Sequence, residues 1–394
     1  MAAPQSPPPR AARLSAIERR EQLAHLAARR FHELGYHRVS LNDAATEAGV
    51  TGPAVYRHFR NKEALLAAAI TSGLDLVEQA VTVGAEHSLE YLVSAVADVG
   101  LHRPDMWVLL QRESRFLGPE LSIPVQDQFA RVVDLFSGRL RRERPHLGAD
   151  EARFLVTAAT AVLSLPSTTR TSLVPIEYRR ELIRSALLCL RADLAVACLM
   201  RLPDHSASEP AAANRREQVI DTAIGLFFRR GYSGVSLDDI GAAVGLAGPS
   251  ILHHFATKAD ILVAAFDRAS SNLAEAQAWR HAAGRAPDLT EFVSTYITFA
   301  LANRAMLGVY VSEQLYLPAH ALDRTRATVR SELRDWTRAL LATSPDLDDH
   351  VARVRVRAAL AAINDLVRVG HFARRARIAP EIAVIAKAVL SGAN

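Results

Sequence analysis

The chain has 394 residues, of which 49% are hydrophobic and 23% charged, with a formal net charge of +5. The chain is too long to fold around one ordinary hydrophobic core, and its length predicts two to four domains of about 100–200 residues each. The hydrophobic-rich composition excludes a collagen or a disordered chain, and the small positive charge permits a polyanionic partner without requiring one.

Residues 1–14 are predicted to form a disordered N-terminal arm. The stretch "MAAPQSPPPRAAR" lacks the apolar run that a signal peptide needs. No later run reaches the roughly 18 apolar residues of a membrane span. The sequence therefore predicts a cytoplasmic protein without a membrane partner.

The chain contains an internal repeat. Residues 31–66 align with 227–262 without a gap, and 14 of the 36 positions are identical. The flanking helices repeat as well, so we interpret the chain as two copies of a unit of about 190 residues.

Within the first copy, residues 40–59 predict two short helices joined by a tight turn. Ser40, and Ser236 in the second copy, are natural helix N-caps. Gly49 can adopt the positive φ that ends a helix, and Pro53 suits the first turn of the next one. This pattern is typical of a helix-turn-helix, whose second helix can enter the DNA major groove. A solvated helix face is the alternative.

Lysine usage gives a separate argument. Of the 47 basic residues only Lys62, Lys258 and Lys387 are lysines, and the first two occupy equivalent positions in the repeat. Each is predicted in the first turn of a helix, where a cation opposes the helix dipole by about 0.3–1 kcal/mol. A backbone phosphate would compensate for that position. Inheritance of two exposed lysines from one ancestral copy is the alternative.

These residues together resemble a known family. The series Phe31, Gly35, Tyr36, Val39, Ser40, Leu41, Ala45, Gly49, Val50, Thr51, Tyr56, His58, Phe59, Lys62, Leu65 and Leu66 is similar to the DNA-binding domain of TetR/AcrR-family transcriptional regulators. The second copy resembles it as well. The resemblance implies an all-α fold, operator recognition by a dimer, and release by a small-molecule effector.

By the same resemblance, the first copy would contact phosphates through Ser40, Thr51, Tyr56 and Lys62, with Gly52, Pro53, Arg57 and His58 on or beside the base-reading helix, and Phe59 in the core. In the second copy the DNA-binding residues would be Ser236, Gly248, Pro249, His253, His254 and Lys258. There Ala247, Leu252, His253 and Ala256 replace Thr51, Tyr56, Arg57 and Arg60. The loss of polar groups predicts weaker DNA binding by the second copy.

The predicted division of the chain follows. It comprises the arm (1–14), a first DNA-binding domain (15–75, helix-turn-helix 39–58), a first helical effector and dimerisation domain (76–200), a linker (201–210), a second DNA-binding domain (211–271, helix-turn-helix 235–254) and a second effector and dimerisation domain (272–394). The long predicted helices are Ala149–Leu165, Ile176–Leu199, Leu347–Phe372 and Pro380–Leu390.

No catalytic, metal or cofactor site is predicted. His32 and His37 are five positions apart, where a zinc-protease motif needs four. Cys189 and Cys198 are nine apart in an apolar run, which suits neither a disulfide within one helix nor a metal clip and predicts buried thiols. Phosphate loops, nucleophile elbows and dinucleotide fingerprints are absent from the sequence.

Two apolar segments, 106–121 and 307–322, each contain one acidic residue, Glu113 or Glu313, within a helical run. Core packing explains such segments by default. Their pattern also resembles TetR-type regulators of lipid metabolism, which implies an acyl chain or acyl-CoA as the effector; its binding residues are not predicted.

The sequence thus predicts an effector-released repressor that binds a double-stranded DNA operator. The two halves would form an intramolecular pseudo-dimer, which the segment 201–214 permits because thirteen extended residues reach about 43–47 Å. A homodimer of tandem chains is the competing arrangement. Two other functions stay open: a regulator that binds DNA only through its first copy, and a ligand carrier or enzyme that keeps the motif as packing.

Overall fold

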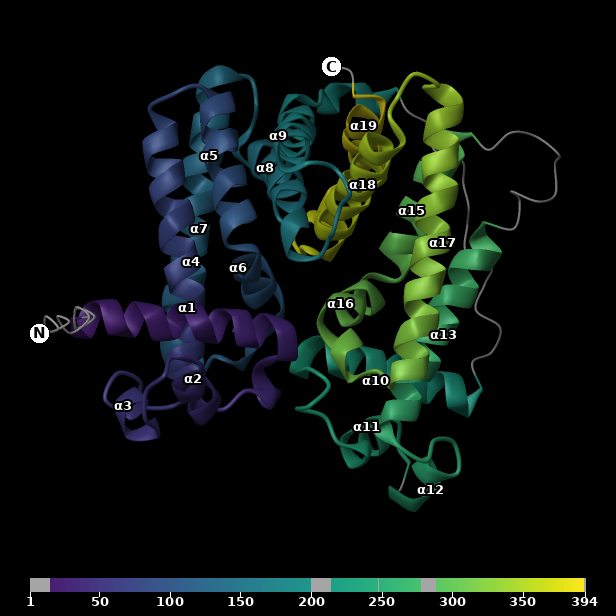
Figure 1. Cartoon of the computed structure of the whole chain (residues 1–394). Helices are drawn as coiled ribbons and strands as arrows, with labels where there is room; N and C mark the ends of the chain where they lie inside the picture. The colour runs from purple at the N-terminus through teal and green to yellow at the C-terminus, as the bar shows by residue number, and fades with distance from the viewer. Residues whose placement is uncertain (1–14, 200–213, 247, 278–287, 393–394) are drawn as a thin grey trace, which may run out of the picture.

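The computed structural model describes residues 15–199, 214–246, 248–277 and 288–392. Within these ranges every regular element is a helix, which confirms the predicted all-α fold, and the two halves repeat one order of helices (Figure 1). The predicted arm at 1–14 and the predicted linker at 201–210 lie outside the described residues.

Each half opens with one longer helix and two short ones and continues with a helical bundle. The first half contains α1 (Ala16–Leu34), α2 (Leu41–Glu47), α3 (Gly52–Tyr56), α4 (Lys62–Ala85), α5 (Leu89–His102), α6 (Pro104–Val108), a π-helical turn (Leu109–Glu113), α7 (Pro119–Glu143), α8 (Ala149–Leu163) and α9 (Pro175–Arg191). The second contains α10 (Arg215–Arg230), α11 (Leu237–Ala243), α12 (Gly248–Leu252), α13 (Lys258–Ala276), α15 (Leu289–Ala302), α16 (Arg304–Glu313), α17 (Ala319–Thr343), α18 (Asp349–Arg368) and α19 (Ile378–Ser391).

One predicted helix is corrected. Ile176–Leu199 is not continuous, because α9 ends at Arg191 and Asp193 accepts a hydrogen bond from the N–H of Ala195, starting a separate 3-10 turn over Leu194–Cys198. This turn leaves Cys198 exposed, so the prediction of two buried thiols is wrong for that residue. The other three long helices agree with α8, α18 and α19 apart from their ends.

Helix α4 is the most apolar long helix among the described residues. By length and composition alone Lys62–Gly84 could cross a membrane, and half of that window is buried inside the structure. The helix packs against α1, α5 and α7, where Leu65, Leu66 and Ile70 are fully buried. Packing within the protein therefore accounts for much of its apolar surface.

The two halves share one apolar core. Helices α8 and α9 pack against α18 and α19 at the centre of the molecule (Figure 1). Buried side chains of both halves belong to one continuous cluster, in which the ring of Phe154 meets the ring of Phe372 edge-to-face at 5.0 Å between centroids. The halves are therefore joined by the kind of packing that holds a single domain together.

A buried ion pair joins the two halves across this core, and the first half lacks the arginine needed for an equivalent second pair. Arg355 Nε lies 2.7 Å from Glu181 Oε1, and these side chains are 7% and 8% exposed. Matching Ala158 with Ala358 places Leu155 at the position that corresponds to Arg355. A pairing of two first halves would thus bury Glu181 opposite leucine.

We expect Arg355→Leu to destabilise the protein by about 3–5 kcal/mol, because it leaves the Glu181 carboxylate buried without a cation. The double variant Glu181→Leu/Arg355→Leu removes both charges and should recover most of that loss. Urea unfolding measures both. The control is Arg153→Leu, which removes an exposed ion pair with Asp134 and should cost about 1 kcal/mol or less. Equal losses for Arg355→Leu and the control would contradict the prediction.

Candidate nucleic-acid interface

Both predicted helix-turn-helix units are present and lie at the same end of the molecule (Figure 1). Ser40 and Ser236 cap α2 and α11 through reciprocal hydrogen bonds with the acidic residue three positions later. Gly49 and Gly245 in the turns have φ values of +64° and +70°, where a side chain would be strained. The second helices, α3 and α12, are called the reading helices below.

The first unit forms a groove of about 460 Å³ on its surface. Three of the predicted phosphate contacts, Ser40, Tyr56 and Lys62, line it together. Arg60, one of the polar groups that the second copy lacks, also lines the groove, as does Arg38, which sequence reasoning missed because it stands outside the family motif. Asp43 lines the groove as well, with its carboxylate hydrogen-bonded to Ser40, but the three cations outnumber it and together with the N-terminal end of α4 suit the groove to an anion.

The other predicted residues of the first unit divide between surface and packing. Thr51, Pro53 and Arg57 are exposed, whereas Gly52 and His58 are half-buried. A Cβ atom on Gly52 would lie 2.8 Å from Asn42 Oδ1, so a larger residue there would have to displace the Asn42 side chain between α2 and α3. Phe59 is buried, as predicted.

Arg20, which was also not predicted from the sequence, supports the end of the first reading helix. The guanidinium of Arg20 lies 4.4 Å from the centroid of the Phe59 ring, and its Nη1 donates a hydrogen bond to the carbonyl oxygen of His58. This contact joins α1 to the end of α3. No local sequence signal reveals it, because the two residues are far apart in the chain.

The two motif lysines have partners inside the protein. Lys62 Nζ lies 4.2 Å from the centroid of the Tyr36 ring, and Lys258 Nζ lies at the same distance from that of Tyr232. Lys258 also donates to the carbonyl oxygens of Tyr232 and Val235, at 2.7 and 2.6 Å. Burial lowers the pKa of both ammonium groups. Contact with phosphate stays a prediction, and the structure adds a packing reason for keeping lysine.

The second reading helix presents a less polar surface than the first. Leu252 is 55% exposed, as Tyr56 is in the first copy. Of the two predicted histidines, His253 is exposed and His254 is half-buried. Gly248 and Pro249 belong to α12, while Ala247 lies outside the described residues.

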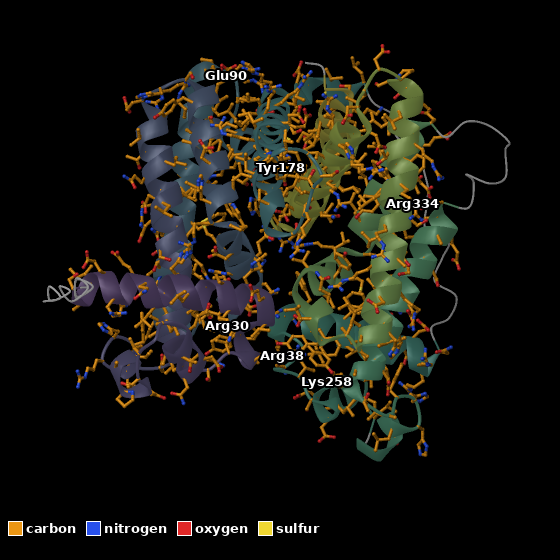
Figure 2. All side chains as sticks on the ribbon, viewed as in Figure 1. Arg30, Arg38, Glu90, Tyr178, Lys258 and Arg334 are labelled. Carbon is orange, nitrogen blue, oxygen red and sulfur yellow. The ribbon has the colours of Figure 1, made fainter. Side chains whose placement is uncertain are left out.

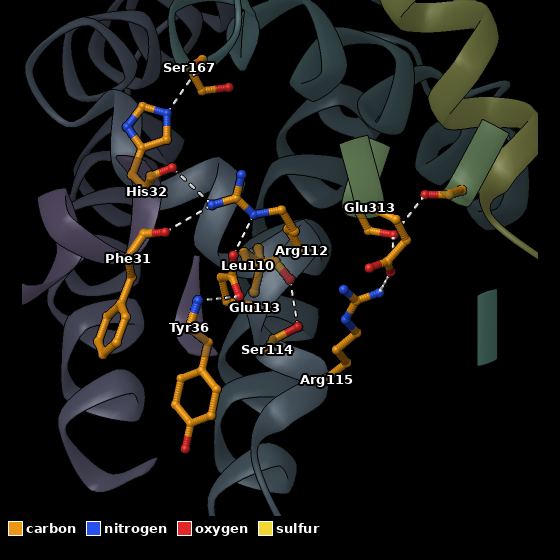
Figure 3. A network of polar contacts seen from close by, with 12 residues as sticks. Phe31, His32, Tyr36, Leu110, Arg112, Glu113, Ser114, Arg115, Ser167 and Glu313 are labelled. Atoms are coloured by element: carbon orange, nitrogen blue, oxygen red, sulfur yellow. Dashed lines mark hydrogen bonds and ion pairs between the residues drawn. The ribbon is translucent and has the colours of Figure 1, made fainter. Parts of the chain in front are cut away.

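The acidic residues of the two predicted effector segments are engaged with protein groups. Glu113 pairs with Arg112 and accepts a hydrogen bond from the N–H of Tyr36 at 3.1 Å (Figure 3). Glu313 is fully buried and pairs with Arg115 of the first half. Neither carboxylate is thus a free anchor for an effector in this structure.

The fold and the two surface-exposed turns define an all-α protein with a pair of helix-turn-helix units in one chain. The model of the family "Bacterial regulatory proteins, tetR family" matches residues 23–69 and 219–265, which contain both units. Each half of the chain therefore contains one domain that matches this family model, which supports a tandem TetR-type duplication.

Several solved structures are similar to this chain, each to less than half of it. The TetR family transcriptional regulator PfmR from Thermus thermophilus is 21% identical, with 46% of this chain and 99% of that chain covered and a TM-score of 0.40. The ketosteroid transcriptional regulator KstR2 of Mycobacterium tuberculosis is 18% identical, with 46% and 96% covered and a TM-score of 0.40. The fatty acid degradation regulator FadR from Bacillus halodurans is 17% identical, with 46% and 96% covered and a TM-score of 0.33. No curated protein matches.

We expect Lys258→Met to lower the free energy of unfolding by about 1–2 kcal/mol, because two half-buried carbonyl oxygens lose their charged donor. Lys62→Met is the matched control. It removes only a contact with an aromatic ring, worth about 0.5–1 kcal/mol. Thermal unfolding of both variants measures the difference. A loss from Lys62→Met as large as that from Lys258→Met would contradict the asymmetry.

Proposed function

We propose that this TetR-family regulator is an effector-released repressor whose two halves form an intramolecular pseudo-dimer and read two dissimilar DNA half-sites. The observation that carries the proposal is the placement of two different reading helices at the same end of one molecule (Figure 1). Regulators with paired helix-turn-helix units place their reading helices about 34–36 Å apart, one turn of DNA.

The packing between the halves supports the pseudo-dimer. The last two long helices of each half, α8 with α9 and α18 with α19, pack together in one core. Glu181 finds its cation, Arg355, only when a first half pairs with a second half. A short covalent linker also raises the effective concentration of the partner half to about the millimolar range.

The differing surfaces of the reading helices support two unequal half-sites. Arg57 is exposed on the first unit, and an arginine can bind guanine through two hydrogen bonds. His253 stands at the equivalent position of the second unit. Each nitrogen of its imidazole ring makes one hydrogen bond, and the two nitrogens point in different directions, so histidine cannot form the paired contact that arginine makes. The motif lysine of the second unit is, in addition, held by backbone carbonyls.

The effector part of the proposal rests on the sequence. The bundles within 76–200 and 272–394 are the proposed effector domains, and an acyl chain or acyl-CoA is the proposed effector class. A cytoplasmic location and the lack of catalytic activity belong to the same proposal.

Gel-shift titration of the full chain against salt tests DNA binding. Specific binding should weaken steeply as salt rises, with a log–log slope of about −0.9 per phosphate contact. Lys62→Met should weaken binding to all sequences alike and reduce the slope by about 1. Binding that is absent or insensitive to salt would favour the ligand carrier.

Arg57→Ala should relax base preference in one half-site only, because it removes about 1–3 kcal/mol of discrimination against the wrong base. Selection of binding sequences from a random duplex pool measures this preference position by position. His253→Ala is the matched variant in the second copy and should have the smaller effect. If Arg57→Ala and His253→Ala each cause an equal loss of base preference in the half-site of their own copy, the two copies do not differ as proposed.

One chain, of 42.9 kDa, should bind one operator, because the pseudo-dimer already supplies both reading helices. Analytical sedimentation of the free protein and of its DNA complex measures the stoichiometry. The single-chain complex should persist when protein concentration is raised. Two chains per operator would instead establish the homodimer of tandem chains.

A further inference from the structure

A polar network runs from the end of α1 in the first half to Glu313 in the second, through the segments that follow α6 and end α16 (Figure 3). In the first half, Arg112 donates to the carbonyl oxygens of Phe31 and His32, both at 2.9 Å, at the end of α1. Arg112 also pairs with Glu113. Here the buried carboxylate and its neutralising cation come from the same half.

The second half lacks this internal cation. Glu313 corresponds to Glu113, but Ser312 stands where the first half has Arg112. Ser312 donates a hydrogen bond of 2.8 Å to Glu313, whose side chain is 0% exposed. The cation paired with Glu313 is instead Arg115, supplied by the first half and 22% exposed on its side chain. A carboxylate buried this deeply is costly to leave unpaired.

Arg115 also contacts the second DNA-binding domain. A Cβ atom built on Gly231, at the end of α10, would lie 3.2 Å from Arg115 Cζ. The guanidinium therefore rests on the backbone that leads into the second helix-turn-helix. The C-terminal end of a helix favours such a cation.

The reciprocal contact runs from the second half to the first. A Cβ atom on Gly35, at the end of α1, would lie 3.4 Å from Leu315 Cδ1. Arg38 Nη2 donates to the carbonyl oxygen of Leu315 at 3.3 Å, at the border between the halves (Figure 2). Each DNA-binding domain is thus seated on a segment of the opposite half, and the ionic contact is the buried one.

We propose that Arg115 is a positioning residue that, through its pair with Glu313, fixes the separation of the two reading helices and so the half-site spacing that the protein accepts. The part that concerns DNA rests on the proposed function. The part that concerns separation is a property of the free protein.

The separation is measured in the free full chain by pulsed electron spin resonance. Spin labels at Tyr56→Cys and Leu252→Cys use exposed sites on the reading helices, in a Cys198→Ser background where Cys189 is buried. We expect a single narrow distance distribution for the parent protein. Arg115→Met should broaden it, and Arg115→Lys, which keeps the cation, should retain it.

Arg115→Met leaves Glu313 buried without a cation and can unfold the domain, so a second variant decides in that case. Arg115→Met/Glu313→Leu removes both charges and should fold with a broadened distribution. The control is Arg131→Gln, which removes a pair with Glu78 on the outside of α7 and should leave the distribution unchanged. A parent-like narrow distribution in either folded Arg115→Met variant overturns the proposal.

Selection from a random duplex pool with unlabelled protein tests the consequence for DNA. The parent chain should select two half-sites at one spacing, whereas Arg115→Met/Glu313→Leu should accept neighbouring spacings and lose affinity several-fold at the parental one. The same single spacing in the variant overturns the DNA part. If the parent selects no sequence, the proposed function fails, and the distance measurement still decides whether Arg115 positions the domains.

Discussion

The structure depends on burying the apolar faces of four helices, two from each half, in one core. Helices α8 and α9 would expose those faces to water without α18 and α19, and the contact of Phe154 with Phe372 shows how closely the halves interdigitate. Because dense packing of this kind resists sliding, the core fixes the relative orientation of everything attached to it. The DNA-binding domains inherit their placement from this core and from the contacts that Arg115 and Leu315 make with the domain of the opposite half.

Charge then distinguishes one half from the other within that shared packing. Glu181 with Arg355, and Arg115 with Glu313, are ion pairs in which each half contributes one partner. Buried pairs of this kind add little net stability compared with apolar residues, but an unpaired partner is strongly unfavourable. They therefore act on which halves can pair, and in which register, more than on how tightly they pair.

The sequence predicted those features that depend on neighbouring residues. The caps at Ser40 and Ser236 and the turn at Gly49 follow from local backbone chemistry, the buried Phe59 is implied by the family resemblance, and the structure has them all. The break after α9, the contact of Arg20 with the first reading helix and the partners of Lys258 could not be predicted in this way. Each depends on which distant carbonyl, ring or charge the fold brings within reach, and neither spacing nor composition encodes that information.

The same reasoning explains what a tandem chain can do that two identical subunits cannot. In a symmetric pair every substitution appears twice, so replacing an internal cation by serine would leave two buried carboxylates to be neutralised across the interface. In this chain Ser312 occurs once, and one arginine from the other half suffices. In a covalent duplication, a buried carboxylate of one half can thus be neutralised by a cation of the other half, while the two halves stay paired in the same chain. The two halves of one chain need not be identical. The reading helices α3 and α12 can therefore differ in sequence, and so can the contacts of Arg115 and Leu315 that hold the DNA-binding domains.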